Sequence, residues 1–119
     1  MQRDQAASPP VCHIVMWDIA GETPAEKQAG IDTVKREFES LRGQIDGMTR
    51  LVVGVDVSRI DYARDVVLVT EFESQAALEA YAAHPAHLAV RDRLGSLRIA
   101  RHQVDYLLSP EDVMHVDHR

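Results

Sequence analysis

The segment Val11-Cys12-His13-Ile14-Val15-Met16-Trp17 is apolar at almost every position, not at alternate ones. The same is true of Leu51-Val52-Val53 and of Val66-Val67-Leu68-Val69. Successive side chains of a strand point to opposite faces of its sheet, so a strand with one face in water alternates apolar and polar residues. These three segments therefore predict strands of a sheet that needs burial on both faces.

A first helix is expected after the opening strand. Thr23 is its predicted N-cap, Pro24 its first residue, and Glu26 completes a capping box. Apolar residues at spacings of three and four then continue the helix to about Gly43. The four strands are expected at residues 11–17, 48–56, 65–73 and about 98–107.

A second helix is expected to be broken in its middle. Ser74 caps its start, and His84-Pro85 interrupts it, because proline donates no backbone hydrogen bond and restricts the residue before it. A further helical piece runs from Pro85 to Leu94. The order β-α-β-β-α-β predicts an α+β, ferredoxin-like fold, in which a four-stranded antiparallel sheet carries its helices on one face.

Two helical segments are too few to cover both faces of such a sheet. The simplest remedy is a second copy of the chain, packed sheet against sheet as a homodimer. The domain is expected over residues 11–108, after a disordered lead-in at 1–10 and before a polar tail at 109–119.

Composition restricts the possible partners and location. The chain has 119 residues and a net charge of −6, and it shows no basic stripe, which argues against nucleic-acid binding. Arg91, Arg93, Arg98 and Arg101 are interpreted as a solvated face with local ion pairs. No membrane span is expected, and the lone Cys12, with no signal-peptide pattern, predicts a cytoplasmic protein.

The densest group of functional atoms is Tyr81-Ala82-Ala83-His84-Pro85-Ala86-His87, which surrounds the helix break. His87 can act as a general base near neutral pH, and Tyr81 can stabilise developing negative charge on a substrate oxygen. Two alternatives remain open. The histidines can be structural, with His84 capping the broken helix, or they can bind zinc if His13 or His102 supplies a third ligand.

Strand alternation adds polar candidates to this group. His13, Val15 and Trp17 point to one face of the first strand. On the last strand Arg101 and Gln103 share a face with Ile99 and Asp105. If that face meets the helices, these side chains make a cavity near His87 polar; if it meets water, they have no role in a site.

These residues, in this order, resemble the stress-responsive A/B barrel (Dabb) family over about residues 11–107. The similarity rests on residues 13–17, Ile45-Asp46-Gly47 with Gly54, Phe72-Glu73-Ser74, Tyr81 with His84-Pro85-Ala86-His87, and Val104-Asp105-Tyr106. The resemblance implies a homodimer whose two sheets form a barrel. In plant polyketide cyclases of this family, the second histidine of the HPxH motif is the base of a cofactor-free aldol cyclisation and a tyrosine assists; His87 and Tyr81 match these positions.

The resemblance also indicates where the pocket of this chain differs. Val34 falls where the plant cyclases carry a pocket tyrosine, and Arg101 and Gln103 fall where their pocket is apolar. A small, polar or anionic carbonyl compound is therefore expected to suit this chain better than a long alkyl polyketide. Predicted ligand contacts come from six residues: His13, Trp17, Val34, His84, Arg101 and Gln103.

The first hypothesis for function is a homodimeric barrel that binds a small molecule and carries out lyase-like or cyclase-like acid–base chemistry at His87, without metal or cofactor. One alternative is a noncatalytic stress or assembly protein in which the HPxH residues only stabilise the helix break. Another is a cofactor-free monooxygenase of the same barrel superfamily, for which Trp17 and His87 are the hints.

Overall fold

The computed structural model describes residues 8–112 and confirms the predicted α+β, ferredoxin-like fold. The predicted lead-in and tail fall largely on residues 1–7 and 113–119, which lie outside the described residues. The elements, in chain order, are β1 (Val11–Ile19), α2 (Pro24–Glu39), β2 (Met48–Val55), β3 (Val66–Phe72), α3 (Gln75–Ala82), α4 (Pro85–Leu94) and β4 (Arg98–Leu107).

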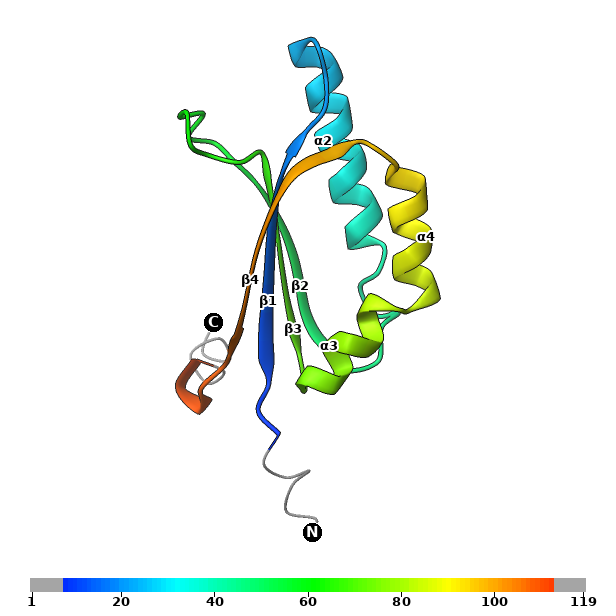
Figure 1. The fold of residues 1–119 in the computed structure, drawn as a ribbon, viewed down its shortest axis with the longest axis vertical. Coiled ribbons are helices and arrows are strands. Elements are labelled where there is room, and N and C mark those ends of the chain that lie inside the picture. Colours follow the sequence, from blue (N-terminus) through cyan, green and yellow to red (C-terminus); the bar gives the residue numbers. More distant parts are fainter. Residues whose placement is uncertain (1–7, 113–119) are drawn as a thin grey trace.

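The strands form one antiparallel sheet in the order β2-β3-β1-β4. Figure 1 shows the sheet nearly edge-on, with α2, α3 and α4 all on one side. The core lies between the helices and the sheet, where Val15 and Leu68 from the strands pack with Phe38 from α2. No helix of residues 8–112 is long and apolar enough to cross a membrane.

Local signals set the helix boundaries. The Thr23 hydroxyl accepts a hydrogen bond from the Glu26 N–H at 3.1 Å, and Pro24 is the first helical residue of α2. The Glu26 carboxylate returns to the N–H of Glu22 rather than to that of Thr23, so the capping box closes one residue early. The helix ends at Glu39, before the predicted Gly43, because the chain enters a turn in which Gly43 has a φ of +84°.

The sheet face away from the helices is apolar and uncovered. Cys12, Ile14 and Met16 of β1 lie on this face and pair with Tyr106, Val104 and His102 of β4. The side chains of Val104 and Tyr106 are 57% and 45% exposed. A hollow of about 490 Å³ also lies at this face, under the β2–β3 loop. The protomer thus leaves open the face whose burial the strand pattern requires.

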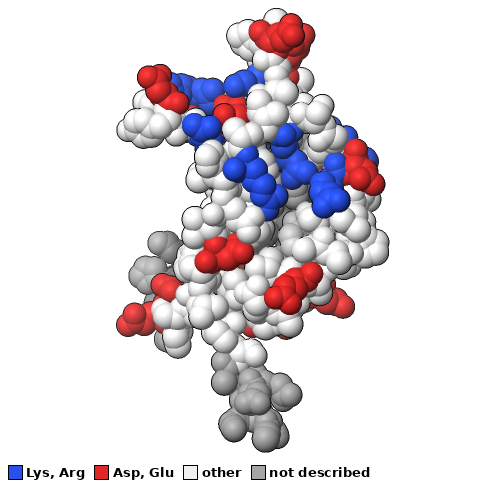
Figure 2. Space-filling model, viewed as in Figure 1, with Lys and Arg blue, Asp and Glu red and all other residues white. Residues whose placement is uncertain are grey.

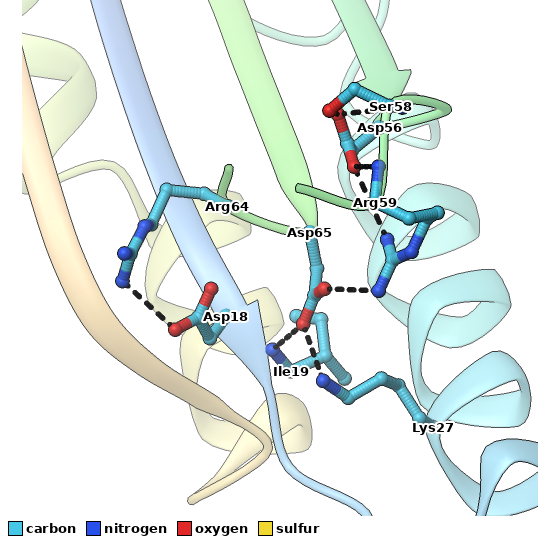
Figure 3. A network of polar contacts seen from close by, with 8 residues as sticks. All are labelled: Asp18, Ile19, Lys27, Asp56, Ser58, Arg59, Arg64 and Asp65. Carbon is cyan, nitrogen blue, oxygen red and sulfur yellow. Dashed lines mark hydrogen bonds and ion pairs between the residues drawn. The ribbon is translucent and has the colours of Figure 1, made fainter. Parts of the chain in front are cut away.

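A buried carboxylate holds the β2–β3 loop against the end of β1 (Figure 3). Asp65 is 3% exposed and accepts hydrogen bonds from the Ile19 N–H at 2.8 Å and from Lys27 and Arg59 at 3.1 and 3.3 Å. Burial raises the pKa of Asp65, but the backbone hydrogen bond from Ile19 and the nearby Lys27 outweigh it, so the pKa lies below its ordinary value.

We expect Asp65→Asn to lower the free energy of unfolding by about 2 kcal/mol, because the buried Ile19 N–H, Lys27 and Arg59 lose their anionic acceptor. Urea unfolding at pH 7 measures this change, with the exposed Asp61→Asn of the same loop as control. Since the pKa of Asp65 is lowered, the wild-type advantage should be complete above the ordinary value of 3.8 and disappear as the pH falls further. A variant as stable as Asp61→Asn at pH 7 would contradict this role.

Candidate active site between the last strand and the broken helix

A cavity of about 250 Å³ lies on the helix side of the sheet, lined by residues of β4 and of the broken pair α3 and α4. Its floor is apolar and consists of Val15, Trp17, Phe38, Leu68 and Leu78. Polar side chains form the rest of the lining: His13 from β1, Gln75, Glu79 and Tyr81 from α3, His87 from α4, and Arg98, Arg101, Gln103 and Asp105 from β4. The cavity therefore combines an apolar floor with titratable walls, as small-molecule sites do.

The helix break brings Tyr81 and His87 together. Tyr81 lies in the last turn of α3 and His87 in the first turn of α4, and their ring centroids are 4.3 Å apart at an angle of 33°. The Nδ1 atom of His87 is 3.3 Å from the carbonyl oxygen of Ala82. Because a carbonyl only accepts, we assign the proton to Nδ1, which leaves Nε2 of His87 as a free base.

Burial sets the protonation states of this pair. It lowers the pKa of His87, and the positive charges of Arg91, Arg98 and Arg101 lower it further, although the hydrogen bond to the Ala82 carbonyl opposes them. Burial raises the pKa of Tyr81 to about 12, although Arg98 and Arg101 act against it. At neutral pH the cavity therefore presents a neutral imidazole beside a phenol that keeps its proton.

A second imidazole stands on the opposite wall. His13 is 7% exposed, and its Nδ1 lies 2.6 Å from the Asp105 carboxylate, across the β1–β4 pair. The other carboxylate oxygen of Asp105 accepts a hydrogen bond from the Gln103 amide at 3.1 Å, and Arg101 donates to the Gln103 carbonyl oxygen. The helix-facing side of β4 is thus one connected polar row that fixes the His13 ring.

The structure corrects the predicted face of the start of β4. Ala100 has a φ of +53°, and the β1–β4 register shifts between Met16 and Asp18, as in a β-bulge. Ile99 consequently pairs with Asp18 on the open face, and Arg98 takes the helix-facing place. The Arg98 guanidinium carbon lies 4.9 Å from the Trp17 ring centroid, beside the cavity.

The structure gathers most of the predicted site residues at the cavity and leaves two of them outside. His13, Trp17, Tyr81, His87, Arg101 and Gln103 line it. Val34, on the buried side of α2, is 0% exposed and does not line the cavity. His84 instead caps α4, and its Nδ1 accepts a hydrogen bond from the Ala86 N–H at 3.0 Å.

Four other polar residues of the cavity were not predicted as ligand contacts: Gln75, Glu79, Arg98 and Asp105. For Asp105 two signals were available: strand alternation placed it on the face of Gln103, and Val104-Asp105-Tyr106 is one of the segments that carry the family resemblance. The zinc alternative needed a third ligand beside His84 and His87. His102 does not supply it, because it lies on the open face of the sheet, whereas His13 lies on the helix-facing side. Within residues 8–112 no three His, Cys, Asp or Glu side chains are grouped to hold a metal ion.

Comparison with known proteins identifies the family. The model of the stress-responsive A/B barrel domain (Dabb) matches residues 11–108. The chain belongs to this family. No curated protein matches the chain.

Solved structures show the same fold in proteins with different chemistry. A dimeric ferredoxin-like protein of unknown function from Bacteroides fragilis shares 27% identity and a TM-score of 0.73 over 83% of this chain and 96% of its own. The hydroxynitrile lyase of Passiflora edulis shares 18% identity and a TM-score of 0.71 over 87% and 96%. SnoaB, a cofactor-independent oxygenase from Streptomyces nogalater, shares 16% identity and a TM-score of 0.56 over 87% and 95%.

We expect His84→Ala to destabilise the Dabb domain by about 1 kcal/mol, because α4 loses its N-cap acceptor. His84→Ser, which restores an N-cap acceptor without an imidazole, should recover most of that loss. Thermal denaturation of the three proteins checks both expectations. If His84→Ser were as unstable as His84→Ala, the imidazole would have a role other than capping.

Proposed function

We propose that this Dabb domain forms a homodimer through its open sheet faces, and that each protomer's cavity binds a small carbonyl compound on which His87 acts as a base. The dimer is supported by the uncovered apolar face of the sheet and by the dimeric relative from Bacteroides. Facing sheets would close a barrel around Ile14, Val69 and Val104, which now meet solvent in part.

One observation carries the proposed chemistry: a neutral imidazole with a free Nε2 lines an open cavity beside a protonated phenol. In the proposed reaction, Nε2 of His87 takes a proton from the carbon next to a carbonyl group, and the electron pair of that C–H bond moves onto the carbonyl oxygen to give an enolate. In the cleavage form of the reaction, Nε2 takes the proton of a β-hydroxyl group instead. The oxygen's electron pair then forms a new carbonyl group, the neighbouring carbon–carbon bond breaks, and its electron pair moves onto the oxygen of the original carbonyl group. The Tyr81 hydroxyl donates a hydrogen bond to the oxygen that gains negative charge.

This chemistry needs neither metal nor cofactor, because the proton taken by His87 can return to the product. Two structural relatives are named as a lyase and as a cofactor-independent oxygenase. At 18% and 16% identity these likenesses concern the fold, so the proposal depends on the cavity itself. A purely structural role for the HPxH motif accounts for His84, which caps α4. It does not explain why Tyr81 and His87 line an open cavity.

The dimer makes a prediction about mass. Light scattering after gel filtration at micromolar concentration should give twice the protomer mass of 13.3 kDa. Val104→Glu places a charge in the middle of the open face and should shift the protein toward the monomer. Ala80→Glu on the exposed side of α3 is the matched control and should stay dimeric. A wild-type monomer would refute the proposed interface.

The base makes a prediction about proton exchange. We expect the protein to speed exchange of the CH₂ protons of phenylacetone and phenylpyruvate with D₂O, followed by proton NMR. His87→Gln should lower the catalysed rate by about 10²-fold or more, and Tyr81→Phe by about tenfold or more. His84→Ser, which keeps the helix cap, is the control. Full activity in His87→Gln would remove His87 as the base.

The pH profile tests the protonation state separately. Because burial lowers the pKa of His87 below its ordinary 6.5, the free base forms at lower pH than for an exposed histidine. The His87-dependent exchange rate should therefore rise with pH, with its midpoint below the ordinary 6.5, and flatten above that midpoint. A midpoint at or above 6.5 would contradict this assignment.

A further inference from the structure

Arg98 carries a positive charge beside the cavity and has no acidic partner among residues 8–112. Its guanidinium lies over Trp17 and Phe38, 4.9 and 5.3 Å from the two ring centroids. Its Nε is buried and has no hydrogen-bond acceptor within residues 8–112, and no ion pair in this range includes it. A buried N–H group without an acceptor costs free energy, so the Nε of Arg98 suits an acceptor from outside the chain.

Two further arginines increase this positive charge. Arg101 lines the same cavity and donates to the neutral amide oxygen of Gln103, and Arg91 has no carboxylate partner in the described part of the chain. Burial lowers the pKa of Arg98, and the like charges of Arg101 and Arg91 lower it further. Figure 2 shows basic side chains gathered on this face between β4 and α4.

Four other arginines of the described residues form ion pairs, namely Arg50, Arg59, Arg64 and Arg93, and none of these four lines the cavity. Arg93 on α4 meets Glu37 at 2.8 Å, and Arg64 meets Asp18 at 2.9 Å. The expected solvated face with local ion pairs thus holds for Arg93, whereas Arg101 is exposed without an ion pair in the described residues and Arg98 is half-buried over aromatic rings. An anion between Arg98 and Arg101 would compensate both charges at once.

The opposite end of the cavity limits what kind of anion fits. Asp105 and Glu79 line it there, and Asp105 is already bound to His13 and Gln103. A second carboxylate on the ligand would meet these negative charges, whereas the apolar floor favours a hydrocarbon body. A cavity of about 150 Å³ holds benzene, so the 250 Å³ here can hold a ring with a short acidic side chain.

We propose that Arg98 and Arg101 form a carboxylate subsite, and that the ligand of this cavity is a monocarboxylate with an apolar body. This inference deepens the proposed function, because it places the acid group of the substrate against β4 and its reacting carbon beside His87. Phosphate is the competing anion, and the experiment includes it.

Binding of phenylacetate and phenylacetamide tests the subsite without any reaction. The two probes have nearly the same shape and differ in charge, and neither is a substrate for exchange at a ketone. Trp17 is the single tryptophan of the chain and lies under Arg98, so its fluorescence reports occupancy directly. We expect phenylacetate to bind at least about tenfold more tightly than phenylacetamide, as measured by fluorescence and calorimetry.

Arginine variants assign this preference to the subsite. Arg98→Met keeps an unbranched side chain over the aromatic rings, and Arg101→Met changes an exposed residue, so the second variant tests the proposal even if the first does not fold. Each should reduce the phenylacetate preference about tenfold and leave phenylacetamide binding unchanged. Arg93→Met, on α4 outside the cavity, should keep the full preference.

Three results would overturn the subsite: equal affinity for the two probes, an unchanged preference in Arg101→Met, or inorganic phosphate that binds as tightly as phenylacetate. Failure of the carboxylate subsite can be distinguished from failure of the proposed base. Loss of His87-dependent exchange with the probe preference intact would reject the base alone. Exchange of phenylacetone that depends on His87, with no preference for phenylacetate, would reject the subsite alone.

Discussion

The sheet has four strands and two apolar faces, but the helices cover only one face, and on that face only three of the strands. The rest of the structure depends on this mismatch. Helices α2 and α3 pack on β1, β2 and β3, whereas β4 lies at the edge with nearly all its side chains exposed. The uncovered face creates the need for a partner. The uncovered edge strand creates the cavity, because the helices stand away from β4.

The second constraint is the break between α3 and α4. A continuous helix would carry Tyr81 and His87 six residues apart on different faces. Pro85 ends the hydrogen-bonded ladder, and His84 caps the new start, so the chain turns and the two rings meet. The same break exposes the Ala82 carbonyl to the His87 ring, which fixes its tautomer. The two histidines of the motif thus have different places, since His84 caps α4 and His87 lines the cavity.

Sequence patterns predicted the fold and the Tyr81–His87 pair because both arise from local signals: caps, a proline break and strand periodicity. They could not place Arg98, because the bulge at Ala100 shifts the alternation of β4, and nothing in the neighbouring residues announces it. The contact of His13 with Asp105 joins residues 92 positions apart, and it depends on strand register. Val34 was assigned by resemblance, but it lies fully buried on the inner side of α2 and outside the cavity lining, which a sequence pattern alone does not reveal.

Strand β4 links the two proposals, because each of its faces belongs to one of them. Val104 and Tyr106 lie on the open sheet face, and Arg101 and Gln103 line the cavity. An edge strand held by β1 alone gains order when its outer face is buried by a second copy. That burial would also hold the polar row against His13 and keep Arg101 near the cavity. The dimer would then matter for the site even without contributing a side chain to it, since it steadies the strand on which half of the polar lining stands.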